Sequence, residues 1–207
     1  LFINALSFGL LMAYLSAAPF VLRNVLGMGT VAYTAVFGLC GATVTVTIAV
    51  AASLVRRFSQ ARQVRVGLIA GLVVDTVFAG VCLTWLREPV TGPERMPLLV
   101  AVVALFLAHV ACLGLSMGNA PALALDRTGR WAGTGSALLG FLQFVVGGLV
   151  SPLVGLTGEA SGVAFGVVIV GVGVIANILA VFGLREKGEK QRLAAQASER
   201  RSQRLGQ

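Results

Sequence analysis

Long uncharged stretches alternate with short charged segments along the whole chain. A helix needs roughly 20 apolar residues to cross a hydrocarbon core about 30 Å thick. Five runs of at least that length contain no Asp, Glu, Lys or Arg, and a sixth is interrupted only by Asp75. The pattern therefore predicts six membrane spans, at approximately residues 1–22, 31–55, 66–86, 98–125, 131–156 and 163–184.

Composition supports a lipid environment. The chain has 207 residues, of which 57% are hydrophobic and 12% are charged, whereas a soluble domain carries about twice that charged fraction. Thr43, Thr45 and Thr47 alternate with other residues in the manner of a strand, but backbone groups in lipid are satisfied within a helix. We therefore expect an all-α membrane protein, a bundle of six transmembrane helices.

The segments between the runs are short. Residues 87–97 hold three prolines and a glycine, which predicts an irregular loop there. Residues 185–207 carry seven cations, three glutamates and few apolar residues. We expect this segment to be a basic cytoplasmic tail outside the transmembrane domain 1–184.

The positively charged residues are concentrated on one predicted side of the membrane. With six spans, thirteen of the sixteen Lys and Arg residues fall on one side of the membrane, and only Arg23, Arg87 and Arg95 fall on the other. This bias follows the positive-inside rule, so both ends are expected in the cytoplasm and the chain in the inner membrane. The net charge of +8 is thereby explained without a nucleic-acid partner.

The cysteines indicate no metal or redox chemistry. Cys40, Cys82 and Cys112 lie in three different apolar runs, and no Cys or His cluster has metal-ligand spacing. We expect buried thiols and no cofactor.

Polar residues form stripes within two spans. Asn4, Ser7 and Tyr14 lie on one face of the first span, and His109, Ser116 and Asn119 lie on one face of the fourth. With Leu11 and Cys112 included, both sets follow the same spacing of i, i+3, i+7 and i+10. One interpretation is that both stripes, with Gln143 of the fifth span, line a water-accessible substrate cavity. The other is hydrogen bonding between helices, worth about 0.6 kcal/mol per contact.

Asp75 and His109 are the ionisable groups deepest in the predicted spans. Asp75 lies 13 residues before Glu88 and His109 lies 13 after Met96, so a hairpin of the third and fourth spans places both at similar depth. A lone carboxylate there costs about 2.5–3.5 kcal/mol, so it should find a partner. We expect the two side chains to share a proton, either as a structural pair, which we favour, or as a titrating element.

Small residues recur at helix-packing spacing. Gly67 and Gly71 form one GxxxG pair, and Gly162 and Gly166 form another. Further candidates for close packing or kinks are Pro121, Gly133, Gly140, Gly147, Pro152 and Gly155.

An intramembrane serine protease is a weaker alternative. Ser136 and His109 are the residue types that such enzymes pair, but their predicted depths differ by roughly 15 Å at 1.5 Å per residue. A nucleophile and its base need hydrogen-bond reach. We therefore do not expect an enzyme.

Three segments resemble a known family. They are Tyr14-Leu-Ser-Ala-Ala-Pro-Phe-Val-Leu22, Gly118-Asn-Ala-Pro-Ala-Leu-Ala-Leu125 running on into Ala132-Gly-Thr-Gly-Ser-Ala-Leu-Leu-Gly-Phe-Leu-Gln143, and Gly147-x-x-x-Ser151-Pro152-x-x-Gly155. With them, residues 1–184 resemble the C-terminal half of a major facilitator superfamily (MFS) transporter of the Bcr/CflA drug:proton antiporter type.

The resemblance implies a function and a missing partner. It implies proton-coupled efflux of small hydrophobic molecules by alternating access, with an N-terminal six-helix half completing the transporter. It also places the first and fourth helices along the cavity and the third, with Asp75, toward the periphery. A transporter of a metabolite such as a sugar or amino acid, or a non-transporting membrane scaffold, stays open as an alternative.

Overall fold

The predicted spans are all present as helices. A computed structural model describes residues 1–125, 131–156, 158 and 161–182. Within these ranges lie six helices long and apolar enough to cross a membrane. They are α1 (Phe2–Pro19), continued by the π-helical turn η1 (Phe20–Val25), then α2 (Thr30–Leu54), α3 (Gln60–Thr84), α4 (Arg95–Leu125), α5 (Ala132–Leu153) and a last helix, Val163–Phe182. The expected all-α six-helix fold is confirmed. The charged segment at residues 126–130 and the tail at 185–207 lie outside the described residues.

Two helices begin earlier than the hydrophobic pattern indicates. α3 starts at Gln60 rather than near 66, because Ser59 caps it: the Ser59 Oγ accepts a hydrogen bond from the Arg62 backbone N–H at 3.3 Å. α4 starts at Arg95, so the expectation that residues 87–97 are entirely irregular is wrong for the last three. Pro97 lies in the first turn, where the N–H that proline lacks has no intrahelical partner.

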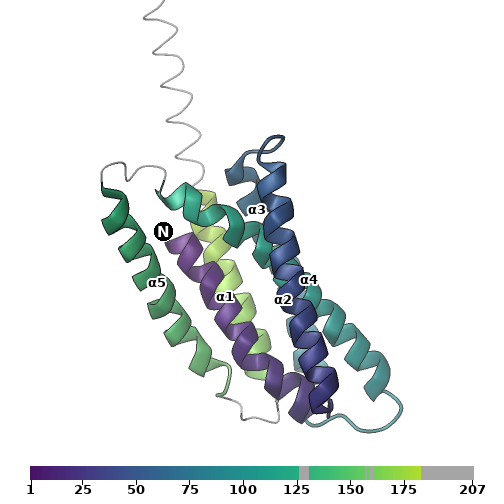
Figure 1. Ribbon diagram of the computed structural model, residues 1–207. Helices are drawn as coiled ribbons and strands as arrows, with labels where there is room; N and C mark the ends of the chain where they lie inside the picture. The colour runs from purple at the N-terminus through teal and green to yellow at the C-terminus, as the bar shows by residue number, and fades with distance from the viewer. Residues whose placement is uncertain (126–130, 157, 159–160, 183–207) are drawn as a thin grey trace, which may run out of the picture.

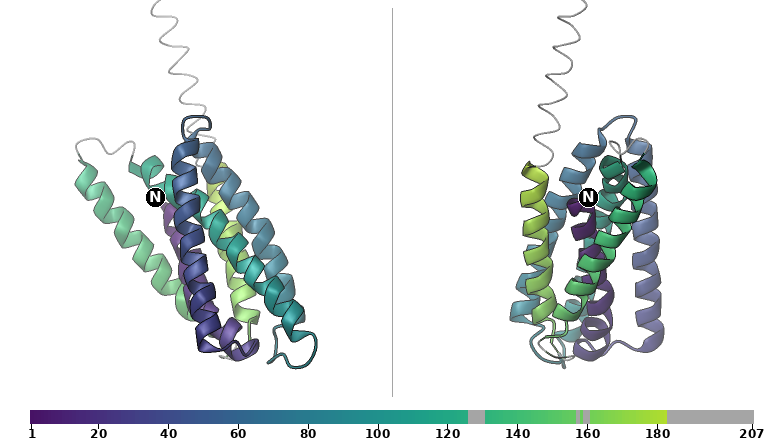
Figure 2. Two further views of the ribbon diagram at one scale, coloured as in Figure 1. Left: turned by 45° about the vertical axis from the view of Figure 1, so that its right-hand side comes forward. Right: turned by 90° about the vertical axis from the view of Figure 1, so that its left-hand side faces the viewer.

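The helices form one compact antiparallel bundle (Figure 1). α1 packs against α5 on one side and α4 on the other, while α4 also contacts α2 and α3. The N-terminus, the turn between α2 and α3 and the C-terminal end of the last helix lie at one end of the bundle, at the top in Figures 1 and 2. The connections α1–α2, α3–α4 and α5 to the last helix lie at the opposite end.

Aromatic rings join the helices at the centre. The Phe78 ring of α3 meets the Phe106 ring of α4 edge to face, with centroids 4.8 Å apart, and Phe165 of the last helix lies 5.2 Å from Phe78. Tyr14 of α1 lies edge to face against Phe106 at 5.3 Å. Since lipid offers no hydrophobic drive for helix association, such packing contributes directly to the stability of the bundle.

The expected glycine contacts are only partly present. A Cβ built on Gly166 would lie 2.9 Å from the Cys82 Cβ, so this glycine lets the last helix approach α3 closely, and Gly147 does the same for α5 against Met12 of α1, at 2.8 Å. Gly133 and Gly140 have no such neighbour within 4 Å among the described residues, and Gly155 meets only the Pro152 carbonyl. The packing role predicted for these three glycines is therefore not found within this bundle.

The two candidate prolines lie in different helical contexts. Pro152 is the next-to-last residue of α5, which ends at Leu153. Pro121 lies four residues before the end of α4, and the helix continues through it to Leu125.

Candidate functional site

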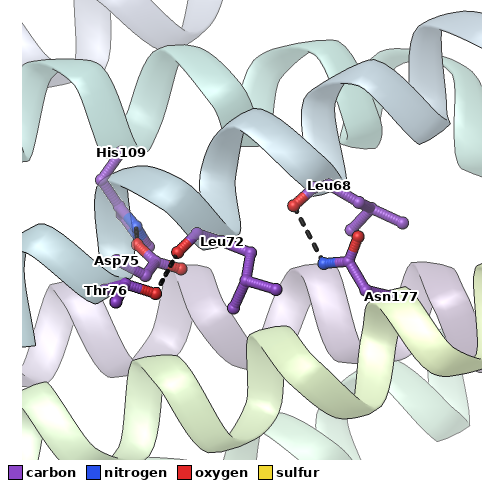
Figure 3. A network of polar contacts seen from close by, with 6 residues as sticks. All are labelled: Leu68, Leu72, Asp75, Thr76, His109 and Asn177. Atoms are coloured by element: carbon purple, nitrogen blue, oxygen red, sulfur yellow. Dashed lines mark hydrogen bonds and ion pairs between the residues drawn. The ribbon is translucent and has the colours of Figure 1, made fainter.

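A buried acid–base pair joins α3 to α4. The His109 Nδ1 and the Asp75 Oδ1 lie 2.5 Å apart, and each side chain is 1% exposed (Figure 3). The expectation that the two groups are close enough to share a proton is thereby confirmed. Asp75 lies 9 residues before the end of α3 and His109 lies 14 after the start of α4, so the equal depth counted from the sequence is only approximate, and the contact forms because the two helices pack side by side.

The other carboxylate oxygen faces the last helix. A Cβ built on Gly173 would lie 3.5 Å from the Asp75 Oδ2, so a glycine here lets the last helix pass close to the carboxylate. Beside the pair is a cavity of about 10 Å³. Its lining includes Asp75, His109, Gly67, Gly71, Cys112 and Ser116. A volume of this size is at the lower limit for one water molecule.

The second ring nitrogen of His109 points away from Asp75. Among the described residues, the His109 Nε2 has no hydrogen bond, although the Leu10 carbonyl of α1 is close enough to interact with the ring electrostatically. The Tyr14 ring centroid lies 6.4 Å from that of His109. Both amide atoms of Asn4, also on α1, are buried without a partner in the described structure. Buried polar atoms are nearly always bonded, so these unsatisfied atoms are unusual and make this part of α1 and α4 a candidate functional region.

The polar stripes of α1 and α4 lie inside the bundle. All six stripe residues are at most 4% exposed: Asn4, Ser7, Tyr14, His109, Ser116 and Asn119. Because the helices are antiparallel and Tyr14 lies beside His109, the lower-numbered residues of α1 fall toward the same end as the higher-numbered residues of α4. Both stripes are therefore buried in this conformation, His109 and Ser116 border the small cavity beside the acid–base pair, and Gln143 of α5 is half-buried.

Three further polar contacts were not anticipated. The Asn119 Nδ2 donates to the Gln63 Oε1 at 3.2 Å, and the Gln63 Nε2 donates to the Phe58 carbonyl at 3.3 Å. The Asn177 Nδ2 donates to the Leu68 carbonyl of α3 at 2.9 Å (Figure 3). The signal for Asn177 is that it is a polar residue in an apolar run, whereas Gln63 lies in a segment that the charge pattern assigned to a loop.

The protease alternative gains no support from the geometry. The Ser136 hydroxyl donates to the Ala132 carbonyl of its own helix and is exposed, while His109 is buried against Asp75. Within the described part of the chain, no group of three or more His, Cys, Asp or Glu residues is placed to hold a metal ion.

Comparison with known proteins gives one informative similarity. No protein-family model matches the chain, and no solved structure matches it significantly. It is 28% identical over 179 residues to the uncharacterized MFS-type transporter YdgK of Bacillus subtilis (strain 168). The alignment covers 84% of this chain and 40% of that protein, so the chain spans about two fifths of the length of the relative it matches.

The chain resembles one half of an MFS-type transporter. This similarity and the six apolar helices support a multi-pass membrane protein.

Proposed function

We propose that this MFS-like half belongs to a secondary transporter of the Bcr/CflA type, which exports small hydrophobic molecules in exchange for protons from the inner membrane. The observation that carries the proposal is the buried Asp75–His109 pair inside a bundle similar to a transporter half. Ionisable groups at membrane depth are costly, so their presence marks a candidate functional site.

The pair offers a defined place for a proton. With Asp75 ionised, a proton on the His109 Nδ1 is donated to the Asp75 Oδ1. The Nε2, which lacks a hydrogen bond within the described structure, is then the nitrogen that gains or releases a second proton toward α1. Because a charged imidazole attracts the carboxylate more strongly than a neutral one does, the gain or loss of this proton changes how firmly α3 and α4 are held together.

The polar stripes supply the proposed substrate face. In this conformation both stripes are buried: Tyr14 of α1 lies beside His109 of α4, whereas Ser116 and Asn119 face α3. Movement of α4 away from both α1 and α3 would expose the six residues Asn4, Ser7, Tyr14, His109, Ser116 and Asn119, and Gln143 of α5 is the remaining candidate for the substrate face. The unpartnered Asn4 amide and His109 Nε2 would then meet water or a polar group of the substrate.

The proposed partner is the N-terminal six-helix half, which would cover α2 and α5. Both helices have little of their apolar surface buried in this bundle. Phe141 and Phe144 of α5 are 63% and 73% exposed, and Phe37 of α2 is 36% exposed. Gly133 and Gly140, which have no neighbour within 4 Å among the described residues, would also lie on this interface.

The test is transport by the full-length protein in proteoliposomes with an imposed pH gradient. Asp75→Asn and His109→Gln should abolish gradient-driven accumulation while leaving exchange of labelled for unlabelled substrate measurable. Thr76→Val is the matched control, because Thr76 is exposed and its hydroxyl donates only to the Leu72 carbonyl of its own helix (Figure 3). If both variants keep gradient-driven transport and its pH dependence, the pair is structural. If metabolites rather than hydrophobic drugs are moved, the drug assignment is wrong.

A further inference from the structure

Four arginines gather at one end of the bundle. Arg56 and Arg57 follow α2, and Arg62 and Arg65 lie in the first turns of α3. All four side chains are exposed. We call these four residues the arginine cluster.

No carboxylate of the described structure neutralises the arginine cluster. The acidic residues within the described ranges are Asp75, Glu88 and Glu94. Asp75 is bound to His109, and both glutamates lie in the α3–α4 connection at the opposite end of the bundle. Four like charges within ten residues repel one another, so an anion bound among them lowers the free energy of this end.

An apolar strip leads directly from the arginine cluster along α3. Val66, Ile69, Val73 and Val77 lie on the same helical face as Arg62 and are 50–61% exposed. From Val66 to Val77 the helix rises roughly 16 Å, about half of a 30 Å hydrocarbon core. The strip therefore has the length of one lipid acyl chain in one leaflet, with guanidinium groups at its outer end.

The turn that carries the arginine cluster is firmly built. The Phe58 backbone N–H donates to the Leu54 carbonyl at 2.8 Å, and the buried Gln63 amide holds the Phe58 carbonyl. The Phe58 ring is 40% exposed, and the Arg62 guanidinium carbon lies 5.0 Å from its centroid. An aromatic ring beside basic groups at the end of a span is typical of the membrane–water interface.

We infer that the arginine cluster and the exposed apolar strip of α3 bind an anionic phospholipid, with the phosphate at Arg62 and Arg65 and an acyl chain along Val66 to Val77. The inference is independent of the proposed transport function. It rests on charge complementarity, since guanidinium groups bind phosphate oxygens in pairs of hydrogen bonds, and on the strip that continues from them.

The experiment titrates phosphatidylglycerol into the purified full-length protein in detergent and follows thermal unfolding. Phosphatidylglycerol should raise the unfolding temperature, and phosphatidylcholine with the same acyl chains should not. An exposed basic residue contributes about 1 kcal/mol to binding an anionic surface, which is roughly a fivefold change in affinity. Arg62→Gln/Arg65→Gln should therefore raise the half-maximal lipid concentration about 25-fold.

Three controls separate lipid binding from other effects. Arg62→Lys/Arg65→Lys keeps the charge and should retain most of the stabilisation, whereas Arg23→Gln/Arg87→Gln at the opposite end should change nothing. If Arg62→Gln/Arg65→Gln fails to fold, Arg56→Gln/Arg57→Gln should still raise the half-maximal concentration. Equal stabilisation of the wild type and Arg62→Gln/Arg65→Gln by phosphatidylglycerol would overturn the inference. So would stabilisation of the wild type by inorganic phosphate alone, because the acyl strip would then contribute nothing.

Discussion

Gly67 of α3 lies so close to Ser116 of α4 that a Cβ built on it would come within 2.7 Å of the Ser116 hydroxyl oxygen. The same Cβ would lie 3.0 Å from the Cys112 backbone carbonyl, which cannot rotate away. Gly71 is the second glycine of this GxxxG pair. Among the described residues, a Cβ built on Gly71 would meet only the Cys112 Cβ, at 3.5 Å, which is an ordinary van der Waals distance. The two glycines of one motif therefore have different roles: Gly67 sets the distance between α3 and α4, and Gly71 does not.

Gly67→Ala and Gly71→Ala should consequently have different effects on the free energy of unfolding. Alanine gains about 1 kcal/mol of helix propensity over glycine at either position. At Gly67 this gain is outweighed by overpacking, which costs about 1–3 kcal/mol. We expect Gly67→Ala to lower the free energy of unfolding in detergent and Gly71→Ala to leave it unchanged or raise it. Equal effects of the two substitutions would contradict the close approach at Gly67.

A double-mutant cycle measures the coupling of Asp75 to His109. Removing one partner leaves a buried polar group unsatisfied, so Asp75→Leu and His109→Leu should each cost about 1–3 kcal/mol. Asp75→Leu/His109→Leu removes both groups, and an apolar replacement of a buried pair is often close to neutral. Denaturant unfolding of the four proteins should thus give a coupling free energy of about 2–6 kcal/mol, the sum of the two single losses that the double substitution avoids. Additive losses would show that the 2.5 Å contact contributes nothing to stability.

Arg95 fastens the start of α4 to the end of η1. Its Nε donates to the Leu26 carbonyl at 2.6 Å, and its Nη2 donates to the Gly27 carbonyl. Gly27 has a φ of +60°, a left-handed conformation that favours glycine, so the chain turns sharply where the arginine binds it.

Arg95→Gln should lose about 1–3 kcal/mol of stability, because a hydrogen bond to a charged donor is stronger than a neutral one. The matched control is Arg87→Gln. Arg87 is exposed in the connection at the same end, and the side-chain hydrogen bond it makes within the described structure is local, to the Leu83 carbonyl in the last turn of α3. Its replacement should therefore stay within about 0.5 kcal/mol of the wild type. Unfolding curves in detergent decide the comparison, and equal losses would show that the clamp on Leu26 and Gly27 is not stabilising.

The sequence predicted those features that depend on local length and depth. Six spans follow from the lengths of the apolar runs, and the Asp75–His109 contact follows from a hairpin that brings both residues to similar depth. The start of α3 was missed because residues 60–65 are polar yet helical, with Ser59 supplying the cap. Polarity alone does not distinguish a loop from a helix that continues beyond the hydrocarbon.

Which neighbour a helical face meets could not be predicted. The spacing of Asn4, Ser7 and Tyr14 places them on one face, but the pattern does not say whether that face meets water or α4. Close approaches at Gly67 and Gly147 decide how the helices pack, and these depend on the shapes of side chains on other helices. The inward orientation of both stripes is therefore a property of the assembled bundle.

Cysteine labelling can show whether the buried stripes become exposed during transport. In the full-length protein with Cys40, Cys82 and Cys112 replaced by alanine, Asn4→Cys and Asn119→Cys should react slowly with a membrane-impermeant maleimide at rest. In the absence of substrate, the open state that binds it is populated at about 0.1–10%. Substrate makes this open state dominant during turnover, so the labelling rate of both cysteines should rise at least about tenfold. The control is a protein in which Cys82 is the single cysteine kept. It should stay unreactive throughout, because Cys82 is 0% exposed. Protection of both stripe positions during measured transport would mean that α1 and α4 do not separate there and that substrate passes along another surface.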